Sequence, residues 1–304
     1  ALSLARRGKW RCRADSPELL QFAVQHRLRY LRVMPGGINS SLLQVATLEW
    51  LRELCIAFPL YDDRLTPANH IELPPRLVIL ELKNVGLQAL PPLPDATLER
   101  LVWCESRSGA GLARRTGPLP SSLLHLQCNL GASYIELPDL PPFLQHLDLS
   151  GSRLRTGALP TLPATLKHLS CVNCHLTHLP DDLPPSLVHL DCGLNRLPAL
   201  PALLPLQLRH LTCRYNRLIV LPVLPATLQH LDCSSNPLTA PLPALPDSLV
   251  HLDCQDTHLT ALPALPARLT YLDSSDNPLA SLPDPLPPGL LQLVCNRNHM
   301  ASLP

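Results

Sequence analysis

The chain has 304 residues, 46% of them hydrophobic, and its 25 Lys and Arg nearly balance its 24 Asp and Glu, leaving a formal charge of +1. This balance gives no electrostatic footprint for nucleic acid or an anionic membrane, and no apolar run approaches the roughly 20 residues that span a bilayer. The 36 prolines are well above ordinary usage, yet the chain is too apolar for a disordered proline-rich segment. Leucine and proline enriched together indicate an internal repeat.

The first predicted elements are two helices. Ser16-Pro17-Glu18 is a good helix start, because Ser caps the helix and Pro suits its first turn, and the apolar residues from Leu19 to Leu28 fit one helical face. Pro35-Gly36-Gly37 ends this helix. A second run, from Ser41 to Phe58, has apolar residues at spacings of three, four or one, which again favours a helix. We therefore predict a helical cap region over residues 1–70.

The alternative for this region is two degenerate repeats. Leu28-x-x-Leu31-x-Val33 also fits the strand template of the repeats that follow. The helical interpretation is favoured because a solenoid needs a polar-faced cap on its first repeat.

From residue 77 onward the pattern L-x-x-L-x-(C/L) recurs at intervals of 20 to 25 residues, and L-P-x-L-P segments stand between the runs. The best-formed unit is LPVLPATLQHLDCSSNPLTA, Leu221 to Ala240. So short a repeat leaves no room for a full helix, and one coil cannot bury its own leucines, so the coils must stack. The runs begin at Leu77, Leu98, Leu123, Leu144, Leu166, Leu187, Leu208, Leu228, Leu249, Leu269 and Leu290.

Each position of the unit has a physical role. The L-x-x-L-x-C run predicts a short strand whose later Leu and Cys point inward while the residues between them point outward. Proline disfavours helix at the preceding residue and donates no backbone bond, so L-P-x-L-P should return as extended, polyproline-like chain on the convex side. A small polar residue at a fixed offset can bond the backbone of the turn and of the neighbouring coil, forming a ladder. This column holds Asn195, Asn216, Asn236, Asn277 and Asn298, with Ser152, Cys174 and Thr257 as substitutes.

The repeated LPxLPxxLxxLxCxxNxL units closely resemble the short LPX-type leucine-rich repeats of bacterial type III secreted effectors, the group that includes YopM and the IpaH and SspH ubiquitin ligases. The resemblance covers roughly Ile71 to Pro304. It implies an α/β solenoid of the leucine-rich-repeat horseshoe type, with one parallel sheet on its concave face and an N-terminal helical cap. We therefore assign residues 71–304 to a solenoid of about eleven repeats of 20–22 residues. Another repeat would begin at Leu303-Pro304, so we expect the natural protein to continue.

Two columns of polar residues are predicted on the exposed face of the sheet. Because neighbouring parallel strands lie about 4.8 Å apart, residues at equivalent positions should form columns across the repeats. The first column, two residues after each leading leucine, is His125, His146, His168, His189, His210, His230, His251 and Tyr271. The second is Gln127, Asp148, Ser170, Asp191, Thr212, Asp232, Asp253 and Asp273.

Three interpretations of these columns remain open. Duplication of one acceptable unit would place loosely paired His and Asp on a solvated face, and this is the favoured interpretation. A pH-sensitive binding surface is the second, because His titrates near neutral pH. The third is a metal site, because two His on neighbouring strands and an Asp could ligate zinc. Nothing marks one set of strands as special, so we predict neither a metal nor another cofactor.

The cysteines indicate a structural role. Seven occupy the last inward strand position, where Leu82 and Leu149 also occur, so we expect buried, reduced thiols without catalytic function. Cys254-Gln255-Asp256 matches the Cys-x-Asp signature of the ligase members in letters only, because Cys254 is one of these core residues. We therefore predict that this chain is not an enzyme. The seven are Cys128, Cys171, Cys192, Cys213, Cys233, Cys254 and Cys295.

We predict that the chain is a protein-protein interaction module that binds another protein, a host protein by the resemblance, and neither nucleic acid, membrane nor a small-molecule substrate. The resemblance implies the target-recognition domain of an effector secreted into the host cytoplasm. The alternatives are the substrate-binding part of an effector ubiquitin ligase and a structural or surface repeat protein. Arg214 and Tyr215 add interface-type anchors, whereas the basic loop from Arg107 to Arg115 is expected to be solvated. The predicted binding residues are His125, His146, Asp148, His168, His189, Asp191, His210, Arg214, Tyr215, His230, Asp232, His251, Asp253, Tyr271 and Asp273.

Overall fold

The fold is given by a computed structural model, which describes residues 2–5, 9–12, 25, 27–33, 48–57, 72–85, 87, 89–105, 113–115, 117–131 and 134–301. The chain divides into two compact units, Ala1–Arg155 and Thr156–Pro304. Within the described residues, no helix is both long and apolar enough to cross a membrane.

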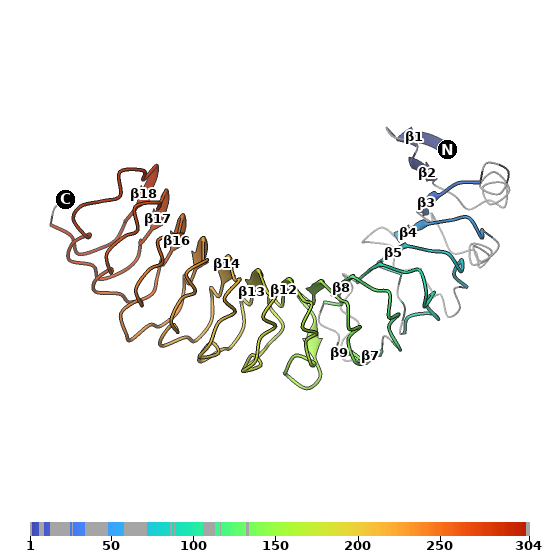
Figure 1. Cartoon of the computed structure of the whole chain (residues 1–304), viewed down its shortest axis with the longest axis horizontal. Helices are drawn as coiled ribbons and strands as arrows, with labels where there is room; N and C mark the ends of the chain where they lie inside the picture. Colours follow the sequence, from blue (N-terminus) through green and yellow to red (C-terminus); the bar gives the residue numbers. More distant parts are fainter. Residues whose placement is uncertain are drawn as a thin grey trace. The chain divides into compact units, whose positions relative to one another are not determined.

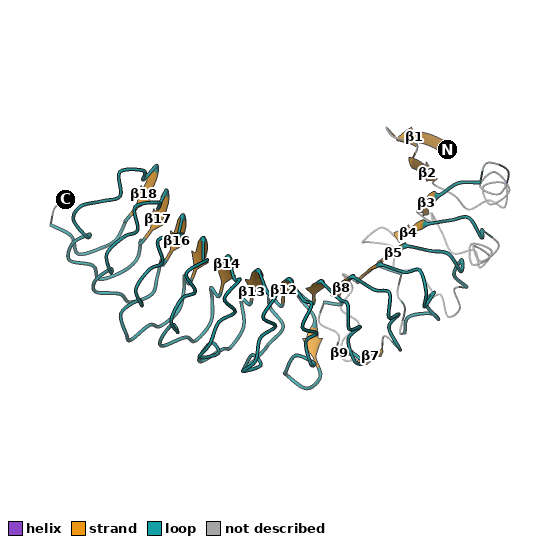
Figure 2. Cartoon of the chain, viewed as in Figure 1, coloured by secondary structure: helices purple, strands orange, loops and turns teal. Residues whose placement is uncertain are grey.

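The first unit contains a sheet whose strands follow one another in chain order (Figures 1 and 2). The first two strands pair antiparallel, and every later pair within this unit that is described is parallel. A second sheet joins three short strands in the order β11-β9-β7: β7 (Ala113–Arg115), β9 (Tyr134–Glu136) and β11 (Arg153–Leu154). The strands of the main sheet are β1 (Leu2–Ala5), β2 (Lys9–Cys12), β3 (Tyr30–Val33), β4 (Glu53–Ala57), β5 (Ile79–Lys83), β6 (Arg100–Cys104), β8 (His125–Asn129) and β10 (His146–Asp148).

The second unit is a regular stack of coils, each with one three-residue strand. Every residue between its first and last strand is described, and none of them is helical, as the repeat length predicted. The strands lie along the inner side of this unit's curve and the loops along its outer side (Figures 1 and 2). They are β12 (His168–Ser170), β13 (His189–Asp191), β14 (His210–Thr212), β15 (His230–Asp232), β16 (His251–Asp253), β17 (Tyr271–Asp273) and β18 (Gln292–Val294).

Alternation of side chains explains the core. In β13 the middle residue, Leu190, is fully buried at 0% exposure, while its neighbours His189 and Asp191 are only partly buried. The leading leucine and the column cysteine of the same coil, Leu187 and Cys192, are also 0% exposed. Each coil therefore contributes the same apolar set to one continuous core, which supplies most of the stabilisation of a stacked fold.

The proline of each L-P-x-L-P segment that lies nearest the strand has a defined role. Its carbonyl accepts a hydrogen bond from the N–H of the leading leucine three residues later, as in Pro184 to Leu187 and Pro225 to Leu228, both at 3.0 Å. A bond of this i to i+3 form closes a β-turn. Because proline contributes only its carbonyl, its missing N–H costs nothing at this position.

The predicted asparagine ladder is confirmed. Asn236 accepts the backbone N–H of Leu218 in the previous coil at 3.1 Å, and its amide donates to the carbonyls of Cys213, Cys233 and Ser234 at 2.9–3.1 Å. Thr257 keeps part of this pattern, with its hydroxyl 2.7 Å from the Cys254 carbonyl. The ladder thus satisfies backbone groups that turn away from the sheet in the coils that carry it.

The predicted N-terminal helical cap is not supported. Strand β4 (Glu53–Ala57) lies inside the second expected helix, and β3 (Tyr30–Val33) occupies the site where the sequence also fitted the strand template. Both strands pair in parallel with their neighbours and with each other, so degenerate repeats describe these residues correctly. The rest of the expected helices, residues 16–24 and 41–47, lies outside the described residues, as do residues 58–71, so the boundary at residue 70 stays a prediction.

Candidate interaction surface

The polar columns lie on the sheet face opposite the leucine core. In the second unit, strand register pairs His168 with His189, then His210, His230, His251 and finally Tyr271. The same register aligns Ser170, Asp191, Thr212, Asp232, Asp253 and Asp273. In the first unit, His125 pairs with His146 and Gln127 with Asp148. All the predicted strand residues therefore lie in register, within their own unit.

The imidazole rings form a stack with two kinds of spacing. At one end of the second unit, His230 and His251 stack at 4.0 Å between ring centroids, and His251 and Tyr271 at 4.1 Å with nearly parallel planes. The His168–His189, His189–His210 and His210–His230 pairs are wider, at 5.8, 5.6 and 5.8 Å, with interplanar angles of 26°, 29° and 32°. Of these rings only that of His210 belongs to an exposed residue.

Burial lowers the pKa of four members of the histidine column, and repulsion between histidines adds to this at three of them. Burial, followed by the charges of His251 and His210, lowers the pKa of His230 to about 4. Burial is also the main cause of the lowered pKa of His168, His189 and His251. These imidazoles are therefore uncharged donors and acceptors at neutral pH.

The aspartates of the second column have a structural function that the sequence did not reveal. In Asp191, Asp232, Asp253 and Asp273, Oδ1 accepts the backbone N–H of the residue two positions later, at 2.9–3.1 Å. This is the bond of an Asx-turn, and it ends the strand. Burial, together with Asp232 and Asp273, raises the pKa of Asp253 to about 6 despite the hydrogen bond from Gln255.

Arg214 and Tyr215 stand at the end of β14. The Arg214 guanidinium Nε lies 3.8 Å from Asp232 Oδ2, and the side chain passes over Gly193, where an added Cβ would be 3.2 Å from Arg214 Cγ. Tyr215 has a φ of 52° and is 53% exposed. A tyrosine in the left-handed backbone conformation is uncommon. The same conformation recurs at the equivalent position of the previous coil, Leu194, with a φ of 56°. The turn geometry therefore presents Tyr215 to solvent.

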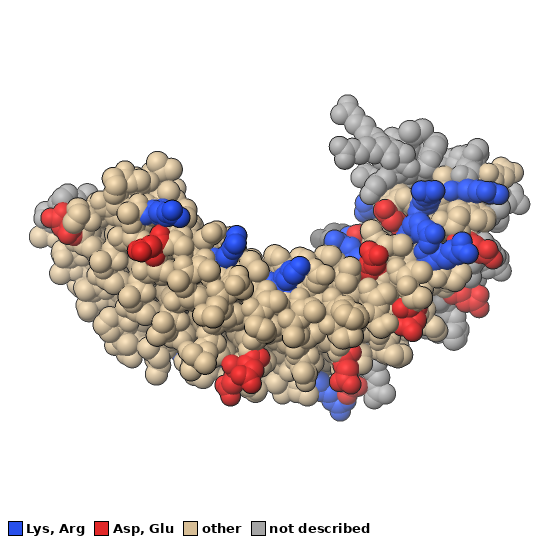
Figure 3. Space-filling view, viewed as in Figure 1, with Lys and Arg blue, Asp and Glu red and all other residues tan. Residues whose placement is uncertain are grey.

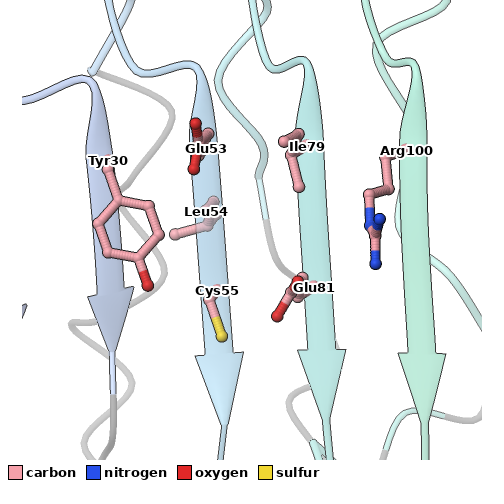
Figure 4. Close-up of a pocket in the computed structure, with 7 residues that line it drawn as sticks. All are labelled: Tyr30, Glu53, Leu54, Cys55, Ile79, Glu81 and Arg100. Carbon is pink, nitrogen blue, oxygen red and sulfur yellow. The ribbon is translucent and has the colours of Figure 1, made fainter. Parts of the chain in front are cut away.

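A hollow in the first unit was missed by sequence reasoning. It has a volume of about 200 Å³ and opens on the sheet face of β3 to β6 (Figure 4). Glu81 accepts a hydrogen bond from Lys83 at 2.8 Å, and this bond and charge outweigh burial and lower the pKa of Glu81. The sequence signal for this hollow is that some of its lining residues occupy the same strand positions as the polar columns. It was missed because the strands before residue 70 were not recognised. The lining residues are Tyr30, Glu53, Leu54, Cys55, Ile79, Glu81 and Arg100.

The two units differ in surface charge on the face seen in Figure 3. Most of the described surface of the second unit in this view is uncharged, whereas Lys, Arg, Asp and Glu gather on the first unit around β3 to β6. The expected basic loop falls largely outside the described residues, which include only Ala113–Arg115 of it, a strand.

The column cysteines of the second unit are buried thiols that resist ionisation. The ten cysteines whose side chains are described are all free, and burial raises the pKa of Cys192, Cys213, Cys233 and Cys254 well above its ordinary value. Cys254 is 0% exposed, and its Sγ lies 3.4 Å from the Asp273 carbonyl. The Cys-x-Asp match at this position therefore does not mark an accessible active-site thiol. Among the described residues, no three or more His, Cys, Asp or Glu side chains are grouped so as to hold a metal ion.

Known proteins share this repeat. The family model described as Leucine Rich Repeat matches residues 227–249. Among solved structures, the chain is similar to YopM, a leucine-rich effector protein from Yersinia pestis, with 27% identity over 88% of this chain and 77% of that one and a TM-score of 0.70. It is also similar to YopM from Yersinia enterocolitica, with 27% identity over 90% and 74% and a TM-score of 0.44. No curated protein sequence matches the chain. The predicted resemblance to YopM-like repeats is confirmed.

Proposed function

We propose that this chain, a leucine-rich-repeat protein with repeats similar to those of YopM, recognises another protein through the exposed sheet face of its second unit. The observation that carries the proposal is the register of β13 to β15. It places His189, His210 and His230 side by side on a face backed by leucines that are 0% exposed. Such a face is rigid, so side chains are held in place before a partner arrives, which lowers the entropic cost of binding.

The anchors of this surface are Arg214 and Tyr215. Arginine and tyrosine are the residue types enriched at the energetic centres of interfaces. Both follow strand β14, and Arg214 lies beside Asp232 of the aspartate column. Arg214 is positioned by Asp232 and by the space above Gly193. Tyr215 is exposed by its turn. With exposed His210, which begins β14, they supply a cation, an aromatic ring and an imidazole from one coil.

We further propose that the partner is a host protein and that the chain is the target-recognition part of a secreted bacterial effector. The support is the similarity to YopM, whose printed description is a leucine-rich effector protein. The effector role would place the chain in the host cytoplasm.

The test uses a variant with His210, Arg214 and Tyr215 all changed to Ala. Purified wild-type and variant chains are used to capture partners from host lysate, and each captured protein is then purified and its Kd measured directly. We expect the variant to stay folded, because all three residues are exposed, and to weaken binding by about 100-fold or more, since one interface anchor is worth about 2 kcal/mol.

A matched control carries changes to exposed residues outside the strands, namely His258, Arg217 and Val223, all to Ala. We expect this control to bind like the wild type. If the control loses the partner while the triple variant keeps it, recognition occurs on the loop side and the proposed surface is wrong.

A further inference from the structure

Four exposed arginines stand in three successive coils of the first unit, just ahead of the strands. Arg29 immediately precedes β3 and Arg52 immediately precedes β4, while Arg27 and Arg76 each immediately precede the leading leucine of their coil. Figure 3 shows Lys and Arg side chains gathered on this part of the first unit. These four residues are called the arginine flank below.

Hydrogen bonds connect three of these arginines across neighbouring coils. The Arg52 backbone N–H donates to the Arg29 carbonyl at 2.9 Å, and the Arg52 guanidinium Nη1 donates to the Arg76 carbonyl at 2.9 Å. Neighbouring parallel strands lie about 4.8 Å apart. The register of β3, β4 and β5 therefore brings the four positive charges onto one short stretch of surface.

The arginine flank is not neutralised within the described part of the chain. Among the described residues, no acidic side chain forms an ion pair with any of its four arginines. Within 27–29, 48–52 and 75–76, the stretches that carry the flank, Glu49 is the one acidic residue. Glu99 occupies the equivalent position before β6, so the positive stretch ends there. Four cations against one carboxylate leave a local positive potential, although the whole chain has a formal charge of only +1.

The fold does not require arginine at these positions. In later coils the residue before the leading leucine is often Ser or Thr, whose hydroxyl donates to the previous leading leucine, as in Ser122 to the Leu98 carbonyl at 2.8 Å. Arg27 and Arg76 have no hydroxyl and forgo this bond. The residue before a strand is Gln or Val in several coils, so a neutral side chain suffices there. The arginine flank therefore departs from the repeat without a structural gain that the repeat supplies elsewhere.

We propose that the arginine flank is a second interaction surface, which binds an acidic segment of a partner protein. A guanidinium presents a planar fork of N–H donors that matches a carboxylate. Asp or Glu residues along an extended segment meet the flank arginines in turn as the segment crosses the coils. This surface belongs to the first unit and does not depend on the sheet face proposed for the second unit.

The surroundings favour a polypeptide over a nucleic acid. Tyr30 and Trp50, each within two residues of a flank arginine, are partly exposed aromatic residues, which are enriched in protein interfaces. Glu49 and Glu99 border the flank, and they would repel a polyphosphate chain because its negative charge is continuous. A peptide avoids this repulsion by placing a neutral residue opposite each carboxylate.

The experiment measures binding of a fluorescein-labelled peptide of alternating Glu and Ser to the whole chain by fluorescence anisotropy. A peptide of about ten residues is up to about 36 Å long when extended, so it spans the about 10 Å between the first and last of three neighbouring strands. The test variant is Arg29→Gln/Arg76→Thr, which leaves the Arg52 bond intact and uses residue types present at equivalent positions. A second variant adds Arg27→Thr and Arg52→Gln.

The matched control is Arg209→Gln/Arg268→Thr. It removes the same charge from the same two repeat positions, but in the second unit. There the equivalent positions between the two arginines hold Gln229, Ser248 and Val250, so these arginines are isolated from each other.

We expect the double variant to weaken peptide binding about fivefold and the quadruple variant about thirtyfold, since each exposed ion pair contributes about 0.5 kcal/mol. The control should bind like the wild type, and a peptide with Gln in place of Glu should not bind. Circular dichroism checks that each variant is folded; if the quadruple variant is not, the double variant decides.

Three results would overturn the proposal. The first is equal binding by the wild type and the folded flank variants. The second is a loss in the control as large as in the double variant, which would mean that net charge and not the flank attracts the peptide. The third is tighter binding of single-stranded DNA of the same length, lost with the flank, which would make the flank a nucleic-acid site. Because the probe is a synthetic peptide and the changes lie in the first unit, none of these results bears on the proposed recognition by the second unit.

Discussion

Changing Asn236 to Ala tests how much each coil depends on the asparagine ladder. The substitution removes one acceptor and three donations: the Leu218 N–H loses its partner, and the carbonyls of Cys213, Cys233 and Ser234 lose theirs. Asn236 is 2% exposed, so water cannot reach these groups without opening the coil. A buried group left unsatisfied costs about 1–3 kcal/mol, and carbonyls with a second partner lose less. We therefore expect the free energy of unfolding to fall by about 3–4 kcal/mol.

Urea unfolding followed by circular dichroism measures this loss. Asn236→Thr should recover about half of it, because Thr257 occupies the same column and its hydroxyl still donates to a strand carbonyl at 2.7 Å. The matched control is Asn296→Ala, since Asn296 is exposed and all its described bonds are made by its backbone: its N–H donates to Ser275, and its carbonyl accepts from Asp276 and Asn298. A cost below about 1 kcal/mol for Asn236→Ala, or no recovery with Thr, would refute the reasoning.

Three further predictions concern the core, the thiols and pH. Leu190→Asp should cost about 4 kcal/mol or more, because it buries an unpaired charge, while His189→Ala should cost under about 1 kcal/mol; equal thermal shifts would mean that the faces are reversed. Thiol titration should find few reactive groups in the native chain and most of the eleven cysteines on unfolding, and a native disulfide between column cysteines would contradict this. Folding lowers the pKa of His230 to about 4, so the free energy of unfolding should fall as pH drops from about 6.5 to 4. Folding raises the pKa of Asp253 to about 6, and protonation of this carboxyl stabilises the fold over part of the same range. From the four histidines with lowered pKa we therefore expect a net loss of about 1–2 kcal/mol. An equal free energy of unfolding at pH 4.5 and pH 7 would show that folding does not hold these histidines neutral.

The repeats after residue 77 could be read from sequence because every physical requirement recurs at a fixed interval. A leucine that must be buried, an asparagine that must bond the previous coil and a proline that must close a turn appear together in each unit. Each of them fixes the same repeat register as the others. The strands before residue 70 lack the asparagine and the L-P-x-L-P segment. Their leucine spacings fit a helical face as well as a strand, so Leu28, Leu31 and Val33 did not decide between the two.

Side-chain partners across coils were less predictable. The Asp column was correctly placed but its bond to the turn was not foreseen, because the Asx-turn depends on the chain direction after the strand. Left-handed backbone at Leu194 and Tyr215 gave no sequence signal, since neither is glycine or asparagine. The hollow around Cys55 and Glu81 depends on strands β3 to β6 lying in register, which no local pattern states.

Repetition itself separates structure from recognition on this surface. An aspartate that closes a turn is retained at most coils for the sake of the fold, so its presence at Asp191, Asp232 and Asp253 says little about a partner. Arg214 has no such structural duty: the equivalent positions in neighbouring coils hold Gly193 and Ser234, and neither carries a charge. Gly193 has no side chain and so leaves room for the Arg214 side chain to pass. On the other side, the Arg214 guanidinium forms an ion pair with Asp232. Arg214 thus departs from the repeat, and the side chains of neighbouring coils accommodate it. A contact specific to one partner is best sought at such a residue.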